Sequence, residues 1–196
     1  MAGPLTPRSR ATRERLLALG VSLFAQRAYD ELSIEDIAAA AGVSHGLLYH
    51  HFGSKRGFYL ATLERAAQEI EELAIAASQD QALPVRDRVR AAIGARVDFI
   101  AARATGYRVV VQGGIGADPQ AQEIVERTRR ASVARAVEDL GIAGSPRVEV
   151  VIHAWTGLFE RALLRWLDEP LLERDELVDL LTDSLLATVT VALPGT

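Results

Sequence analysis

The chain has 196 residues, of which 49% are hydrophobic and 24% charged, and its formal net charge at pH 7 is -4. This length holds one sizeable domain or two small ones, and the apolar content is ample for a packed core, so the chain is expected to be globular. The absence of cysteine excludes a disulfide framework and a thiolate metal site, and the absence of any run of about 18 apolar residues excludes a bilayer-spanning helix.

The charge is divided unevenly along the chain. Residues 1–57 hold seven Lys or Arg against five acids, whereas the remainder holds fifteen against twenty-one. A basic front and an acidic body suit a protein whose front meets phosphates, and chance variation among solvated faces is the alternative. No apolar segment follows the charged N-terminus, so it is not a secretion signal. We expect a cytoplasmic protein without a membrane partner.

Residues 1–7 read as a disordered arm, because they contain proline and glycine and little to bury. A helix is predicted from about Ser9 to Arg27, with its leucines and one phenylalanine facing the core. Arg8, Arg10 and Arg13 could reach nucleic-acid phosphates or a minor groove. The alternative is a solvated first helical turn.

The stretch Leu32–Lys55 predicts two short helices that meet at a tight turn. Ser33 is a good N-cap for the first helix, and Asp36 completes a capping box three residues later. Gly42 can take the left-handed conformation that closes this helix, and Ser44 is a fresh N-cap for the next one. Two helices joined by a short turn containing glycine form a helix-turn-helix, which is a DNA-binding motif.

The second helix, from His45 to about Phe52, has two distinct faces at 3.6 residues per turn. Leu48 and Phe52 point inward. His45, Gly46, Tyr49 and His50 form a neighbouring face, here called the reading face, whose polar tips suit phosphates and base edges. We predict phosphate contacts from Ser33, Ser44, Tyr49 and Lys55, base contacts from His45, Gly46 and Leu47, and either kind from His50.

At these residues the chain resembles the TetR family of bacterial transcriptional regulators. The matching residues are Phe24, Tyr29, Ile37, Ala38, Ala41, Gly42, Val43, Ser44, Gly46, Tyr49, His51, Phe52, Ser54 and Lys55. Sequence detail is shared over about the first 60 residues, and beyond them only the layout of helices is. One departure is Arg56-Gly57, which replaces the commoner acidic pair after Lys55 and makes the expected DNA side more basic.

The rest of the chain predicts further helices and no convincing strand. Val109 to Val111 could suggest a strand by periodicity, but a single strand would have no partner, so Tyr107–Gln112 is interpreted as a short helix closed by the glycines that follow it. The other helices are expected at about 54–78, 84–106, 118–140, 147–168 and 172–192. The fold class is therefore all-α, with about nine helices.

The last two predicted helices carry more apolar surface than one core face requires. Side by side, they could pair with their copies across a two-fold axis in a four-helix contact, which is also where the TetR family dimerises. The candidate dimer residues are Val151, Leu158, Ala162, Leu181 and Leu185.

The resemblance also implies a cavity for a small inducer in the helical body. The candidates are aromatic or polar residues on otherwise apolar helices, and each could instead be a core or helix-contact residue; for His153 an interior position is expected. They are Phe99, Arg103, Tyr107, Gln112, His153, Trp155 and Glu160. Their identities suggest a small, largely apolar ligand with one or two polar groups.

No set of nucleophile, base and metal ligands converges in the sequence, so no enzyme activity, cofactor or metal site is predicted. His50 and His51 are adjacent, and on a helix they point about 100° apart. The glycines near residue 114 follow no strand and precede no Lys-Ser/Thr pair, so a phosphate-binding loop is not expected.

These features together predict two domains, a three-helix DNA-binding head at residues 1–55 and a ligand-binding and dimerisation body at residues 56–196. The expected function is a homodimeric transcriptional regulator, a repressor that binds a near-palindromic operator in double-stranded DNA and is released by a small molecule. The alternative is a helical ligand-binding or protein-interaction module whose DNA head is inactive.

Overall fold

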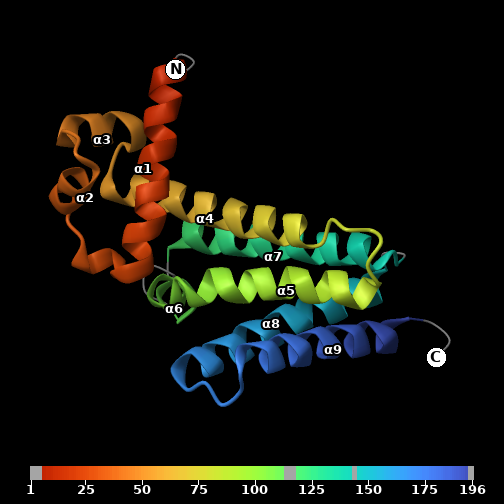
Figure 1. Cartoon of the computed structure of the whole chain (residues 1–196). Helices are drawn as coiled ribbons and strands as arrows, with labels where there is room; N and C mark the ends of the chain where they lie inside the picture. Colours follow the sequence, from red (N-terminus) through yellow and green to blue (C-terminus); the bar gives the residue numbers. More distant parts are fainter. Residues whose placement is uncertain (1–5, 113–117, 143–144, 194–196) are drawn as a thin grey trace. The chain divides into compact units, whose positions relative to one another are not determined.

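The computed structural model describes residues 6–112, 118–142 and 145–193. Within these ranges the chain forms nine α-helices, one short 3-10 helix (Tyr29–Glu31) and no β-strand (Figure 1), which confirms the all-α fold class. The helices are α1 (Pro7–Gln26), α2 (Ile34–Ala41), α3 (His45–Phe52), α4 (Lys55–Ala77), α5 (Val85–Ala101), α6 (Ala104–Gln112), α7 (Pro119–Leu140), α8 (Pro146–Asp168) and α9 (Arg174–Ala192). Among them, none is both long and apolar enough to cross a membrane.

The segment between α5 and α7 agrees with the sequence prediction in part. Tyr107–Gln112 is helical, as expected. However, α5 ends at Ala101 rather than near Gly106, and α6 already begins at Ala104, so Gly106 lies inside a helix. The glycines predicted to close α6, at positions 113, 114 and 116, lie outside the described residues.

The contacts between helices divide the chain into two compact units. The first unit holds Met1–Gln68 and Arg103–Ile124, and the second holds Glu69–Ala102 and Val125–Thr196. Both divisions fall inside helices, namely α4 and α7. The boundary predicted at residue 55 separates a DNA-binding part from a ligand-binding part. The compact units do not follow this boundary.

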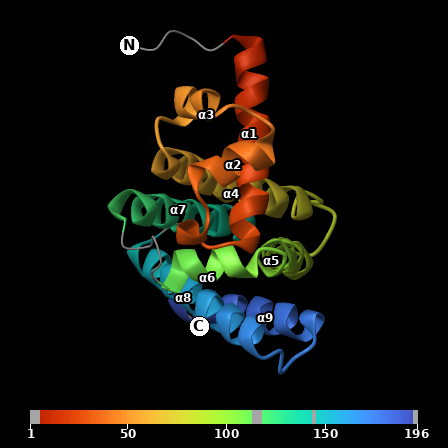
Figure 2. The same cartoon turned by 90° about the vertical axis from the view of Figure 1, so that its left-hand side faces the viewer.

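In the first unit, α1 packs against both α2 and α6, and α2 packs against α3. Figure 2 shows α2 crossing α1, with α3 beside them. The core of this unit is made by buried aliphatic and aromatic side chains, each of which stabilises the fold by about 1.5 to 3 kcal/mol when fully buried. Its members are Leu16, Phe24, Leu32, Ile37, Leu48, Phe58 and Tyr59.

In the second unit, α9 packs against both α5 and α8. Its buried side chains come from all three of these helices and include Val97, Ile152, Leu163, Val178 and Leu181. Because α9 meets two neighbours, it buries two of its faces and leaves one stripe outside.

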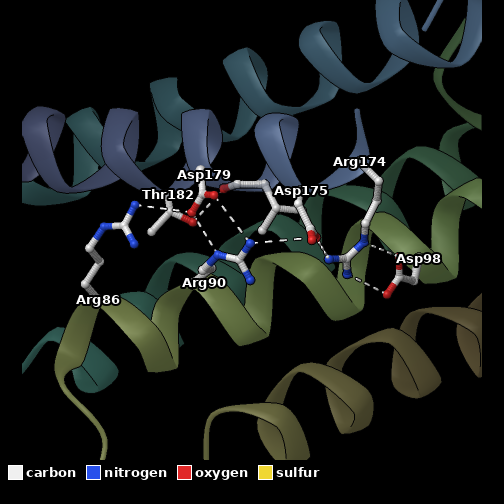
Figure 3. Close-up of polar contacts among 8 residues, drawn as sticks. Arg86, Arg90, Asp98, Arg174, Asp175, Asp179 and Thr182 are labelled. Carbon is white, nitrogen blue, oxygen red and sulfur yellow. Dashed lines mark hydrogen bonds and ion pairs between the residues drawn. The ribbon is translucent and has the colours of Figure 1, made fainter. Parts of the chain in front are cut away.

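A row of ion pairs joins α5 to α9 in the second unit (Figure 3). Arg86 Nε donates to Asp183 Oδ1 at 2.8 Å, and Arg90 Nε donates to Asp179 Oδ1 at 2.8 Å. At the other end Arg174 of α9 makes a two-pronged contact with Asp98, with the shorter N···O distance 2.7 Å. These side chains are partly exposed, so each pair adds little stability, but the row fixes the position of α9 along α5.

Candidate functional site

The start of α2 has the capping box that the sequence predicts. Ser33 Oγ accepts a hydrogen bond from the Asp36 N–H at 3.0 Å, and Asp36 Oδ2 accepts from the Ser33 N–H at 2.9 Å. The Ser33 hydroxyl also donates to Asp36 Oδ2 at 2.7 Å. These bonds hold the pKa of Asp36 below its usual value. Both donors of Ser33 are therefore occupied, and a phosphate contact at Ser33 stays a prediction that would require one of these bonds to break.

The turn between α2 and α3 is also built as expected. Gly42 has φ 61°, the left-handed conformation that favours glycine, and the Val43 N–H donates to the Ala38 carbonyl oxygen at 3.1 Å. Ser44 Oγ then accepts from the Leu47 N–H at 3.3 Å and caps α3. The two helices thus meet at a three-residue turn, which is the geometry of a helix-turn-helix.

The two predicted faces of α3 separate clearly. Leu48 is fully buried in the core of the first unit, whereas Tyr49 keeps 45% of its surface exposed. His45, Gly46 and His50 are exposed as well, and the rings of His45 and Tyr49 lie 4.6 Å apart. The reading face is therefore exposed. The buried side chain of Leu48 anchors α3 in the core and so fixes the position of this face.

The turn between α3 and α4 brings the two helices into unusually close contact. Ser54 Oγ accepts from the Gly57 N–H at 2.9 Å and caps α4. A Cβ atom on Gly57 would lie 2.1 Å from the carbonyl oxygen of Phe52, so no larger residue fits without a shift of the backbone. Lys55 places its Nζ 4.0 Å from the centre of the Tyr29 ring, a cation–π contact that holds its side chain against the first unit.

The sequence predicted that Arg56 makes the DNA side more basic. In the structure, Arg56 adds no free positive charge, because it is paired with a carboxylate. Its Nε donates to Asp118 Oδ2 at 2.5 Å and a second nitrogen donates to Asp118 Oδ1 at 2.8 Å. This contact lowers the pKa of Asp118. Asp118 also accepts from the Gln120 N–H at 2.9 Å at the start of α7. The carboxylate thus neutralises Arg56 and caps a helix at the same time.

The N-terminal arginines lie on α1 rather than on an arm. Thr6 Oγ1 accepts from the Ser9 N–H at 3.2 Å, so the helix starts at Pro7, two residues before the expected position. Arg8 and Arg10 are exposed. Arg13 places its guanidinium 5.4 Å from the centre of the Phe52 ring. The predicted arm falls mainly on residues 1–5, outside the described part of the chain.

Two polar atoms of the first unit are buried without a hydrogen-bond partner, the hydroxyl of Tyr59 and Nδ1 of His51. Burial raises the pKa of Tyr59 to about 12. Burial, together with the nearby His50 and Arg13, lowers the pKa of His51. Burial therefore favours the neutral form of both groups, of which Tyr59 is a core residue and His51 is only partly buried.

The residues predicted for a ligand cavity are divided between the two compact units. Arg103 and Tyr107 belong to the first unit, whereas the others with described side chains belong to the second. His153 is exposed, so its expected interior position is wrong, and its contact with a ligand stays a prediction. The side chain of Gln112 lies outside the described part of the structure.

Three of the candidates are held by other residues of the second unit. Phe99 is 8% exposed and belongs to the core. Trp155 Nε1 donates to Ser184 Oγ at 2.9 Å. Glu160 accepts from Arg129 at 2.5 Å in a half-buried ion pair between α8 and α7. These contacts account for the buried polar groups without a ligand, although a ligand could compete for them.

A polar cluster that the sequence analysis missed joins α4, α5 and α7 in the second unit. Arg96 contacts Glu71 at 3.1 Å, and Ser132 Oγ donates to Glu71 Oε1 at 2.6 Å. The side chains of Arg96 and Glu71 are only 18% and 19% exposed. Sequence alone does not show that Glu71, Arg96 and Ser132, which lie on three different helices, meet.

A separate hollow of about 350 Å³ lies at the start of α5 and the end of α7. It is lined by polar residues that include Arg88, Arg135 and Asp139, and none of the predicted ligand residues reaches it. No group of three or more His, Asp or Glu in the described ranges is arranged to hold a metal ion.

The candidate dimer residues divide into exposed and buried ones. Leu158 is 46% exposed, and Val151 and Ala162 are partly exposed. Leu181 and Leu185 are only 1% and 4% exposed. These two leucines are used by the subunit's own core, since α9 packs on both α5 and α8, and they have almost no surface to offer a partner. The exposed apolar residues of these helices are instead Val150 at 69%, Leu158, Leu180 at 56% and Val191 at 68%.

Comparison with known protein families gives two matches that together span most of the chain. The family described as bacterial regulatory proteins, tetR family, matches residues 16–62. The family described as tetracyclin repressor-like, C-terminal domain, matches residues 85–188. The crystal structure of a tetR-family transcriptional regulator from Streptomyces coelicolor has a TM-score of 0.82 and 30% sequence identity, over 93% of this chain and 82% of that one.

Curated relatives match over shorter stretches. The chain is 35% identical over 111 residues to the HTH-type transcriptional activator FasR of Mycolicibacterium smegmatis, which covers 55% of this chain and 49% of FasR. It is 46% identical over 52 residues to the HTH-type transcriptional repressor KstR2 of the same organism, which covers 26% of this chain and 24% of KstR2. The matched stretches thus span half or less of these relatives.

Proposed function

The chain belongs to the TetR family of bacterial regulatory proteins, and we propose that it is a repressor that binds a near-palindromic operator as a homodimer and is released by a small molecule. It is a DNA-binding transcriptional regulator of the helix-turn-helix type. The named relatives include an activator and a repressor, so the direction of regulation belongs to the proposal. The proposal involves binding alone, in the cytoplasm, with no catalytic step.

The observation that carries the proposal is the exposed reading face on a capped and anchored helix. Each subunit would place α3 in a major groove, with base contacts from His45, Gly46 and Leu47. Tyr49, exposed at the same face, and the backbone at Ser44 would contact phosphates. Lys55 would contact a phosphate after leaving, or alongside, its contact with Tyr29. Residues 1–55 are thus proposed as the DNA-binding head and residues 56–196 as the body.

The proposed dimer surface is the exposed apolar stripe on α8 and α9. Val150 and Leu158 lie eight residues apart on α8, and Leu180 and Val191 lie eleven apart on α9. These spacings place each pair on one side of its helix. Because α8 packs against α9, the four side chains can form a single surface that meets its own copy across a two-fold axis. Val151 and Ala162 would flank this surface.

The proposed inducer is small and largely apolar, with one polar or acidic group. The second unit contains Arg129, paired with Glu160, and Arg96, paired with Glu71. An acidic ligand group could replace either carboxylate, so these half-buried pairs are proposed as points of ligand recognition beside Phe99 and Trp155. The ligand must favour a conformation that does not fit DNA, because equal affinity for both states would shift nothing.

Fluorescence anisotropy of the protein with its own promoter-proximal DNA and with a scrambled duplex, at several salt concentrations, tests the proposal. We expect tight binding only to the former, a steep loss of affinity with rising salt, and two subunits per site. His45→Ala should change the preferred sequence, whereas Tyr49→Phe should weaken binding to all sequences alike. Leu158→Glu should give monomers in sedimentation analysis and loss of operator binding.

The alternative is a ligand-binding or protein-interaction module with an inactive DNA head. One observation favours it: residues 28–54 contain four acids and neither Lys nor Arg. This alternative predicts equally weak binding to every duplex under all conditions of salt and pH, and that result would reject the regulator.

A further inference from the structure

The helix-turn-helix segment of this chain has an unusual charge. Between Arg27 and Lys55 the sequence contains no Lys or Arg, but it contains Asp30, Glu31, Glu35 and Asp36. Three of the four histidines of the chain also lie in this segment, all on α3. When its histidines are neutral, this segment, which is proposed to contact DNA, therefore carries a net negative charge.

One of these carboxylates, that of Asp36, is fixed by its surroundings in the charged form. Asp36 is held ionised by the two hydrogen bonds from Ser33, which lower its pKa. Glu35 is exposed on α2 and its Oε1 lies 3.8 Å from Nε2 of His45. The repulsion that these acids exert on phosphates can be offset only by cations on or beside the reading face.

The fixed cations beside α3 are engaged elsewhere in the first unit. Arg13 of α1 lies over the Phe52 ring, Lys55 of α4 lies over the Tyr29 ring, and Arg56 is bound by Asp118. The guanidinium of Arg27 donates to the carbonyl oxygen of Glu31. Arg8 and Arg10 are exposed, but they belong to α1, so the reading face on α3 carries no permanent cation of its own.

The two exposed histidines are placed to supply that charge. His45 and His50 are both exposed on α3. His45 faces Glu35 of α2 and the ring of Tyr49, and the His50 ring lies 5.4 Å from that of His51. Histidine is the side chain whose charge changes in the neutral range, and a nearby phosphate favours its protonated form.

We propose that protonated His45 and His50 provide the positive charge with which α3 approaches DNA, so that DNA binding takes up protons and tightens as the pH falls from 8 to 6. The inference rests on the proposed DNA-binding function and adds the proton as a second ligand of the same surface. The protein would thereby respond to acidification as well as to its inducer, because a ligand that binds one state preferentially shifts the population towards it.

His51 is not part of this set. Its Nδ1 is buried without a partner, and its environment, with Arg13 and His50 nearby, disfavours a charge. Protonation of His51 would oppose folding rather than assist binding, so the two exposed histidines and the partly buried one respond to acid in opposite ways. Measurements should therefore stop at pH 6.

The size of the effect follows from linkage. Each proton taken up fully on binding increases the affinity up to tenfold for each unit that the pH falls. A dimer has four such histidines, of which only some need to change state on binding. We expect the dissociation constant for the operator to fall at least about tenfold between pH 8 and pH 6 at constant salt.

The test is anisotropy with the operator duplex at pH 8, 7 and 6, combined with calorimetry in two buffers of different ionisation enthalpy, which counts the protons taken up. The double variant His45→Gln/His50→Gln should bind weakly at every pH and take up almost no protons. The double variant His45→Lys/His50→Lys, with permanent charges, should bind tightly at pH 8 and also lose the pH dependence.

The outcomes separate the inference from the function on which it rests. Operator-specific binding by the wild type that changes less than twofold between pH 8 and 6 overturns the inference and leaves the regulator intact. A pH dependence that persists in the glutamine double variant overturns it too. Failure to bind any duplex even at pH 6 rejects both. Circular dichroism at each pH confirms that the variants are folded.

Discussion

The buried hydroxyl of Tyr59 lowers the stability of the first unit. Tyr59 is 4% exposed, its ring packs edge-on against Phe24 at 4.9 Å and against Tyr29 at 5.2 Å, and its hydroxyl has no hydrogen-bond partner. Tyr59→Phe removes only that oxygen and leaves the ring contacts in place. Since a desolvated hydroxyl without a partner costs about 1 to 3 kcal/mol, the variant should be more stable than the wild type, by about 1 kcal/mol.

Because of the same hydroxyl, the stability of the protein depends on pH in the alkaline range. Burial raises the pKa of Tyr59 from 10.0 to about 12, so the unfolded chain loses this proton before the folded chain does. The corresponding stability is complete below pH 10 and is lost as the pH rises through 12. Two pH units correspond to a loss of up to about 3 kcal/mol. Tyr59→Phe should lack this loss.

Urea unfolding of both proteins, followed by circular dichroism at pH 7.5 and at steps from pH 9 to 11.5, measures these effects. In thermal unfolding at neutral pH, the melting temperature of the variant should rise by about 2 to 4 °C. Tyr49→Phe is the matched control, because Tyr49 is 45% exposed, and it should change the unfolding free energy by less than about 0.5 kcal/mol. A clear loss of stability in Tyr59→Phe would mean that its hydroxyl is bonded in solution, and the reasoning would be refuted.

Other substitutions probe the remaining contacts. Gly57→Ala should destabilise the first unit by about 1 to 3 kcal/mol and abolish DNA binding, because the added Cβ has no room. Gly46 has open space around it, so Gly46→Ala should stay folded and lose only DNA affinity. Asp118→Asn keeps an oxygen to cap α7 but releases the charge of Arg56, so anisotropy should show tighter DNA binding with a steeper salt dependence. Asp179→Asn should lower the urea midpoint at low salt and have little effect at 1 M salt, where ion pairs are screened.

The helix-turn-helix could be predicted from the sequence because each of its determinants acts over a few residues. Ser33 finds Asp36 three positions away, and Gly42 and Ser44 close one helix and open the next within three residues. The exposed and buried faces of α3 follow from helical periodicity alone. Local rules are sufficient where both partners of an interaction lie in the same turn of the chain.

Contacts between distant parts of the sequence were not predictable by such rules. Arg56 meets Asp118 across 62 positions, and Arg90 meets Asp179 across 89. Leu181 and Leu185 were taken for partner contacts because α8 and α9 together carry more apolar surface than one face needs. The sequence does not show that α9 has two neighbours within its own subunit, and this second neighbour uses the excess.

The charge of the DNA-binding head shows how this limit affects function. By sequence, residues 1–57 carry two more basic than acidic residues, which suggests a surface that attracts DNA under all conditions. In the structure, the charge of Arg56 is neutralised by Asp118, and the reading face has only imidazoles to offer. The charge of Arg56 is therefore conditional on a carboxylate, and the charge of the reading face is conditional on a proton. A head of this kind does not bind phosphates by excess charge, so its affinity is open to control by acid and by any change that separates Arg56 from Asp118.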